Sequence, residues 1–232
     1  MLAELVEAGP LFLHGAGLTM LYTVLGAAAA LVVSFAFGLM SLSGSVVVRG
    51  FSRVVVEFFR GTSLVVQLLW IFFVLPQLGL RFEPMAAATL AFGLNFGAYG
   101  AEVVRGAIAS VPKTQWEATV ALGLSRFRRM SRVILPQALP EMVPPFGNLW
   151  IQILKSSSLL YLIGITELTF EVKQLQFEMG SMAAFSIALV VYFLLAQILV
   201  AVTRRVEART AARIGRGAKA NAVTRRRGVA PT

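Results

Sequence analysis

The sequence predicts an all-α integral membrane protein with five transmembrane helices. Its 232 residues are 57% apolar and only 14% charged, and the mean hydropathy is +0.78. A water-soluble domain of this size could not bury so much apolar surface. A bilayer core about 30 Å thick requires about 20 apolar residues in a helix. Five segments meet or approach this length: 18–40, 64–80, 85–101, 142–165 and 179–203.

Charge and length distinguish the five segments. Four of the five segments carry no charged residue. The remaining segment, 142–165, carries only Lys155. The second and third are short for a span, so we expect the second to extend backwards to Arg60 and the third to extend forwards to Arg105. Residues 1–203 are therefore assigned to one transmembrane domain.

The lysines and arginines fall mainly on one side of the predicted spans. Of 21 in total, three lie between the first and second spans, six between the third and fourth, and nine after the fifth. Only Arg81 and Lys173 lie on the opposite side. By the positive-inside rule the basic side is cytoplasmic, so we predict an N-terminus outside and a C-terminus inside. Residues 204–232 are expected to form a basic, disordered cytoplasmic tail.

Several kinds of chemistry are excluded by residues that the chain lacks. No lysine follows a glycine, so a phosphate-binding loop ending in Gly-Lys-Ser/Thr is impossible and the chain cannot hydrolyse ATP by itself. One His, no Asp and no Cys leave no His-based triad and no clustered metal ligands. We predict no catalytic residue, no metal and no cofactor. The net charge of +10 fits topology and anionic membrane lipid better than nucleic acid.

The segment 111–136 predicts a pair of short amphipathic helices at the cytoplasmic surface. Gly123 permits the turn between them, and we expect Pro136 to end the second, basic helix. Trp116 and Glu117 are expected to contact a groove in another protein, although an ordinary interfacial helix would show the same composition. The first helix contains Thr114, Gln115, Trp116, Glu117 and Ala118.

Polar side chains inside the apolar spans are candidates for a substrate pathway. Lys155 lies near the middle of the fourth span, where a charge costs about 2.5–3.5 kcal/mol and marks a functional candidate. The prolines before it, Pro144 and Pro145, and the serines and Gly164 after it favour a helix that is interrupted or lines a cavity. Pairing with Glu102, or extension toward the interface, would explain Lys155 equally well. The other candidates are Ser156, Ser157, Ser158, Asn95 and Gln67, of which the last two fit helix packing better than ligand binding.

Four short motifs occur in an order that resembles one family of membrane proteins. They are Arg-Gly-Thr-Ser-Leu at 60–64, Arg-Gly-Ala-Ile at 105–108, Glu-Ala-Thr at 117–119 with Gly123 and Val-Ile-Leu-Pro at 133–136, and Leu-Lys-Ser-Ser-Ser-Leu at 154–159 before Ile-Gly and Glu-Leu. Together they resemble the polar amino-acid permeases of ATP-binding-cassette (ABC) importers. The chain departs from that family's pattern at Ser63, which replaces Pro, and at Ser156, which replaces Asp.

The resemblance implies a type I ABC importer permease fold in the bacterial cytoplasmic (inner) membrane, crossed several times. It implies half of a translocation pathway driven by separate ATPase subunits. The implied partners are a pair of P-loop ATP-binding subunits, a second permease subunit (identical or similar) and an extracytoplasmic solute-binding protein. The implied coupling residues are Thr114, Gln115, Trp116, Glu117, Ala118 and Gly123.

Substrate and mechanism leave alternatives open. Serine in place of Asp at position 156 favours a zwitterion with a delocalised or hindered cation, such as ectoine or hydroxyectoine, while polar amino acids fit comparably. A self-contained secondary carrier or channel for small zwitterions is the main alternative function. An intramembrane hydrolase built from Lys155 and a neighbouring serine is a weaker one, because adjacent helical residues do not face each other.

Overall fold

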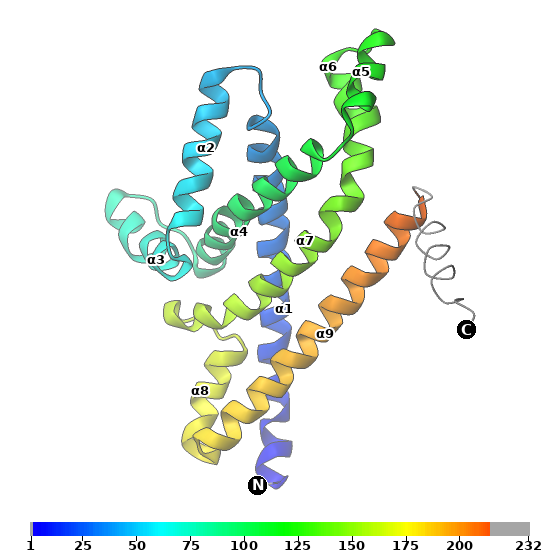
Figure 1. Cartoon of the computed structure of the whole chain (residues 1–232). Helices are drawn as coiled ribbons and strands as arrows, with labels where there is room; N and C mark the ends of the chain where they lie inside the picture. Colours follow the sequence, from blue (N-terminus) through cyan, green and yellow to red (C-terminus); the bar gives the residue numbers. More distant parts are fainter. Residues whose placement is uncertain (1, 214–232) are drawn as a thin grey trace, which may run out of the picture.

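The computed structural model describes residues 2–213, and this part of the chain consists of helices joined by short turns (Figure 1). The predicted all-α class is confirmed for the described residues. In chain order the elements are α1 (Leu2–Met40), α2 (Val46–Gly61), α3 (Leu64–Leu69), the π-turn η1 (Trp70–Val74), the 3-10 turn η2 (Leu75–Leu78), α4 (Pro84–Ala109), α5 (Lys113–Ala121), α6 (Arg126–Arg129), the π-turn η3 (Met130–Ile134), α7 (Leu135–Ser156), the 3-10 helix η4 (Ser157–Ile163), α8 (Leu168–Met179) and α9 (Ser181–Arg213).

Two of the described helices are long and apolar enough to cross a membrane alone, Gly9–Met40 within α1 and Ser181–Thr210 within α9. The number rises to four if each of two bent pairs is one span: Val46–Gly61 with Leu64–Leu78, bent by 102°, and Arg126–Ile163 with Leu168–Met179, bent by 63°. Five spans are thus not confirmed by length and composition. The predicted third span, α4, is long enough but is not among the helices that are apolar enough to cross a membrane alone.

Helices α1 and α4 pack against each other at very short range through glycines. A Cβ atom built on Gly97 would lie 2.5 Å from Val33 Cβ, and one on Gly93 would lie 2.9 Å from Ala29 Cβ. A side chain at Gly100 would meet the hydroxyl of Ser34. Close helix approach through small residues is a main source of packing energy in membrane proteins, where no hydrophobic effect holds helices together. The main core lies along this contact and extends onto α7.

The two ends of the bundle carry different elements. The α1–α2 turn, α5 and α6 lie at one end, and α8 lies at the other end beside the N-terminal part of α1 (Figure 1). The first of these ends also carries Arg49, Lys113 and the arginines of α6. Arg49, Lys113 and the α6 arginines, which the positive-inside rule counts as cytoplasmic, thus lie at the end that carries α5.

The structure corrects the predicted effect of Pro136. We expected this proline to end the second helix of the loop, but α6, η3 and α7 form one helical stretch from Arg126 to Ser156. In the π-turn the N–H of Leu135 donates to the carbonyl of Met130 five residues back. Pro136 directly follows this π-turn, and local π adjustments of this kind let a helix continue through a proline.

The predicted tail does not begin at the end of a helix. α9 continues without interruption through residue 203 to Arg213, so the first ten residues of the segment 204–232 are helical. The remaining tail residues, 214–232, lie outside the described residues, and so does the disorder that was predicted for them.

Candidate functional site

Helix α5 carries the predicted coupling residues and stands at the end of the bundle. Thr114, Gln115, Glu117 and Ala118 are exposed on it. Trp116 is half-buried and packs partly against the main core. Its contact with a partner stays a prediction.

Gly123 ends α5 in a Schellman motif. Its N–H donates to the Val120 carbonyl at 2.9 Å, and the N–H of Leu124 donates to the Thr119 carbonyl at 3.1 Å. These are the two hydrogen bonds that define the motif, and its turning residue adopts a left-handed conformation. Gly123 does so with φ of +67°. The predicted turn is therefore confirmed, and it fixes the direction in which the chain leaves α5.

Exposed apolar side chains surround this turn and were missed by the sequence analysis as a group. Val120, Leu122 and Phe127 are 56%, 75% and 79% exposed. We call these three residues, together with exposed Glu117 and Gln115, the α5 surface. Apolar residues of this exposure beside a tight turn are typical of a protein contact. The signal in the sequence was the presence of apolar residues on both sides of Gly123.

Asn95 and Gln67 meet at the end of α2. Asn95 Nδ2 donates to the Phe59 carbonyl at 3.1 Å, and Gln67 Nε2 lies 2.9 Å from the same oxygen and 3.3 Å from the Thr62 carbonyl. The last carbonyls of a helix have no partner within it, and inside a membrane each unsatisfied group costs several kcal/mol. The two amides therefore satisfy the backbone where the chain bends sharply between α2 and α3.

This geometry predicts a structural role for Gln67. Replacing Gln67 with leucine should lower the free energy of unfolding by about 1–3 kcal/mol, because it removes one of two side-chain donors to the Phe59 carbonyl and the donor to the Thr62 carbonyl. Substrate selectivity should not change. Thermal unfolding of the purified protein and competition assays of uptake measure the two effects. Gln152→Leu, at an exposed position on α7, is the control, and equal losses in both variants would contradict the prediction.

Lys155 lies in the last turn of α7 and is exposed. The α-helix ends at Ser156 and continues as η4, so the predicted interruption after Lys155 is confirmed. Glu102 pairs with Arg105, which makes the suggested Lys155–Glu102 pair wrong. Among the described residues, no hydrogen bond joins Lys155 or its neighbouring serines to Asn95 or Gln67.

The serine hydroxyls after Lys155 are engaged with the backbone. Ser157 donates to the Leu154 carbonyl at 2.7 Å, and Ser158 donates to the Lys155 carbonyl at 2.9 Å. A hydroxyl has one hydrogen to donate, so neither is poised to give its proton to Lys155. The arrangement caps the end of α7, and it does not favour a Ser-Lys hydrolase.

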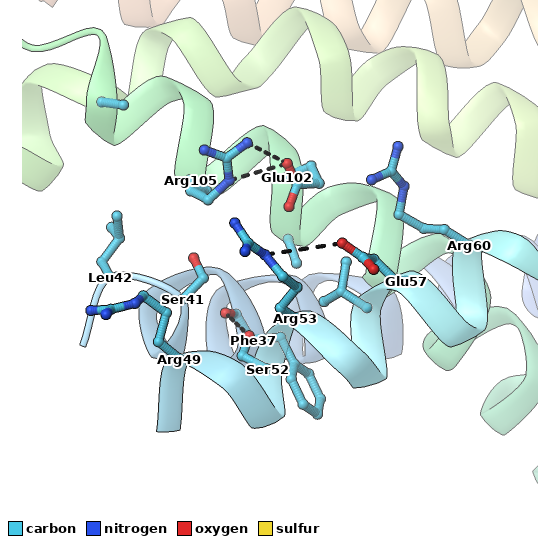
Figure 2. A pocket seen from close by; sticks show the side chains of 13 residues that line it. Phe37, Ser41, Leu42, Arg49, Ser52, Arg53, Glu57, Arg60, Glu102 and Arg105 are labelled. Atoms are coloured by element: carbon cyan, nitrogen blue, oxygen red, sulfur yellow. Dashed lines mark hydrogen bonds and ion pairs between the residues drawn. The ribbon is translucent and has the colours of Figure 1, made fainter. Parts of the chain in front are cut away.

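A charged trough between α2 and α4 is the feature that the sequence analysis missed (Figure 2). α2 has a charged face and an apolar face, and the charged face turns toward α4. The spacing of the charged residues along α2, four, four and three, places them on one face of a helix and was visible in the sequence. The charged residues of the trough are Arg49, Arg53, Glu57, Arg60, Glu102 and Arg105.

Known proteins resemble the chain over most of its length. A "Probable amino-acid ABC transporter permease protein y4tF" of Sinorhizobium fredii is 46% identical over 206 residues, which cover 86% of each chain. The "Glutamine transport system permease protein GlnP" of Escherichia coli is 38% identical over 203 residues, 86% of this chain and 93% of the relative.

Solved structures agree with the sequence relatives. A chain of an amino acid ABC transporter crystallised with histidines superposes with a TM-score of 0.81 at 30% identity, covering 88% of this chain and 96% of the other. A chain of the MetNI methionine ABC transporter in an inward-facing conformation, at 19% identity and a TM-score of 0.71, shares the fold. The family described as "Binding-protein-dependent transport system inner membrane component" matches residues 23–212. The chain therefore belongs to the family of binding-protein-dependent transport system inner membrane components.

Proposed function

We propose that this chain is the permease subunit of an ATP-driven ABC importer that carries amino acids across the bacterial inner membrane. The observation that carries the proposal is the 46% identity, over 86% of both chains, to a relative described as an amino-acid ABC transporter permease. A structure of an amino acid ABC transporter that matches at a TM-score of 0.81 supports it. The amino acid itself is left to experiment, with ectoine-type solutes as a second class to assay.

The α5 surface is the proposed contact with the ATPase subunits. It lies at the basic end of the bundle and presents Glu117 and exposed apolar side chains. The chain leaves α5 through the turn at Gly123, which has a left-handed conformation. A short helix tied to the core by Trp116 and to α7 by the 3.4 Å contact between Gln115 Oε1 and Gln137 Nε2 can transmit the motion of a partner. Such coupling requires different contacts in the two conformations of the transporter.

The proposed topology has five spans. These are α1, the bent α2–α3 pair, α4, α7 with η4, and α9, with the N-terminus outside and the α5 end in the cytoplasm. α4 serves as a span in spite of its polar residues because it is enclosed by α1, α2 and α7, and much of its surface faces protein. Five spans form half of a pathway, so a second permease subunit, identical or similar, completes the pore, and an extracytoplasmic binding protein delivers the solute.

Co-purification and transport test the proposal together. The chain is isolated from its native membranes in mild detergent, partners are identified by mass spectrometry, and the complex is reconstituted into liposomes. We expect a P-loop ATPase to co-purify, and we expect uptake of a labelled amino acid that requires ATP. Glu117→Arg combined with Leu122→Glu should release the ATPase, while Arg81→Gln, at an exposed position outside the α5 surface, should not. Uptake without any ATPase would contradict the proposal.

A further inference from the structure

The charged trough is large enough for a small solute. Its volume is about 400 Å³, within the range of about 300–1,000 Å³ that is usual for small-molecule sites. The end of α1, the charged face of α2 and the facing side of α4 enclose it (Figure 2). Four arginines and two glutamates line it, so charges of both signs are available to one ligand.

The two ion pairs of the trough differ in strength. On α4, Arg105 donates to Glu102 Oε2 from Nε at 3.1 Å and from Nη2 at 2.5 Å. On α2, Arg53 Nε lies 4.0 Å from Glu57 Oε1, and the two side chains are 78% and 70% exposed. Exposed pairs of this kind contribute little to stability. Little energy is therefore lost when Arg53 and Glu57 give up their contact with each other and bind the charged groups of a ligand instead.

In the proposed topology, where α2 belongs to a span, the trough is longer than a lipid headgroup layer is thick. From Arg49 to Arg60 the charged face of α2 rises eleven residues, about 16 Å at 1.5 Å per residue. The headgroup region accounts for only about 5–8 Å on each side of a bilayer. The opposite face of α2 is apolar and exposed at Val47, Val54 and Phe58. This helix thus presents one face suited to lipid or protein and one face suited to a water-filled passage.

We propose that the trough binds the α-carboxylate and α-ammonium groups of the transported amino acid, with Arg53 holding the carboxylate and Glu57 holding the ammonium. This inference rests on the proposed function and adds a binding site near the cytoplasmic end of the pathway. Arg105 and Glu102, which are hydrogen-bonded to each other, form the opposite wall (Figure 2). Like the wall on α2, this wall carries one positive and one negative side chain in the pair.

A zwitterion fits these walls better than a simple anion does. A phosphate or a lipid phosphodiester would be attracted by the arginines but would meet the Glu57 and Glu102 carboxylates in the same cavity. A solute that carries both charges finds a partner for each of them. Charge-assisted hydrogen bonds of this kind are the strong ones, and the site need not recognise the amino-acid side chain.

Ligand binding to the full-length chain in lipid nanodiscs tests the inference without the binding protein. Saturation-transfer NMR is first run with a mixture of the standard L-amino acids. The methyl ester and the N-acetyl derivative of the strongest responder then remove one charge at a time. We expect the free amino acid to bind and both derivatives to bind at least about tenfold more weakly, since each loses one charge-assisted hydrogen bond.

Substitutions identify the residues. Arg53→Gln should weaken binding of the free amino acid about tenfold and remove the discrimination against the methyl ester. Glu57→Gln should do the same for the N-acetyl derivative. Arg53→Lys should retain most of the binding, and Arg81→Gln should match the wild type. A purely structural pair would not produce these derivative-specific changes, and the exposure of both side chains allows the variants to fold.

The results of these experiments distinguish failure of the proposed binding site from failure of the proposed permease function. Absence of binding to the wild-type chain, equal binding of the methyl ester, or wild-type binding by Arg53→Gln and Glu57→Gln would each overturn the site. Stronger binding of inorganic phosphate than of any amino acid would assign the trough to an anion and would also overturn it. ATP-dependent amino-acid uptake by the reconstituted complex would in these cases leave the proposed function standing, whereas loss of that uptake alone would overturn the function.

Discussion

Replacing Gly123 with valine should reduce ATP-driven uptake about five- to thirtyfold while leaving the protein inserted and folded. Gly123 has φ of +67°, and no atom lies within 4 Å of the position where its Cβ would stand. The penalty is therefore conformational and not steric. A left-handed conformation costs an ordinary L-residue about 1–2 kcal/mol, and a β-branched residue is especially disfavoured there. That energy corresponds to a five- to thirtyfold change in the population of the turn.

Uptake and ATPase binding are measured on the same reconstituted complexes. Asparagine tolerates the left-handed conformation far better than valine, so Gly123→Asn is the matched control and should keep most of the uptake. The Schellman turn sets the direction of the chain after α5, and its loss should misplace the α5 surface relative to the ATPase. Equal uptake by the valine and asparagine variants would rule out a role for the turn in coupling.

Replacing Gly97 with leucine should destabilise the protein by about 3 kcal/mol, the upper end of the cost of overpacking. The added Cβ would lie 2.5 Å from both Val33 Cβ and Val33 Cγ1 and 3.2 Å from the Ala30 carbonyl oxygen. The backbone of α1 lies on one side of this contact, so relaxation requires the two helices to separate. Thermal unfolding of the purified protein, followed by size-exclusion chromatography, measures the effect.

The same helix offers a matched control. Gly106 also lies in α4, but a Cβ there has no atom within 4 Å, so Gly106→Leu should be neutral. Gly97→Ala adds a methyl group that would meet the Val33 side chain. Val33→Gly removes that side chain, so the double variant Gly97→Ala, Val33→Gly should show less of the clash than Gly97→Ala alone. If Gly97→Leu and Gly106→Leu unfold at the same temperature, the close contact of α1 with α4 does not hold the core.

Particular residues show how far sequence reasoning reached. The turn at Gly123 and the break after Lys155 were predicted correctly, because each depends on local chemistry: a glycine in a left-handed conformation and serines that bond to nearby carbonyls. The end of a helix at Pro136 was predicted wrongly. A π-turn five residues long directly precedes the proline and lets the helix continue through it, and no local pattern indicates such a turn.

The candidate site depended more on tertiary contacts. Trp116 was expected to contact a partner, and the sequence did not indicate that it also packs partly against the core behind α5. Gln67 and Asn95 lie 28 residues apart in the chain, and both reach the Phe59 carbonyl only because α2, α3 and α4 meet there. The trough has charges on α2 that are visible in sequence, but its second wall is supplied by α4.

The sequence by itself determined that the chain is an apolar helical membrane protein, where the turn at Gly123 lies, and which family the chain resembles. These properties follow from composition, periodicity and short motifs, which act over a few residues. Only the tertiary structure decided which side chains bond the backbone carbonyls at the bend after α2, and which face of α5 is exposed. It also decided that α2 and α4 enclose a charged trough. Such properties depend on the close approach of helices from distant parts of the chain, as in the glycine contacts between α1 and α4, and they therefore arise only when the bundle is assembled.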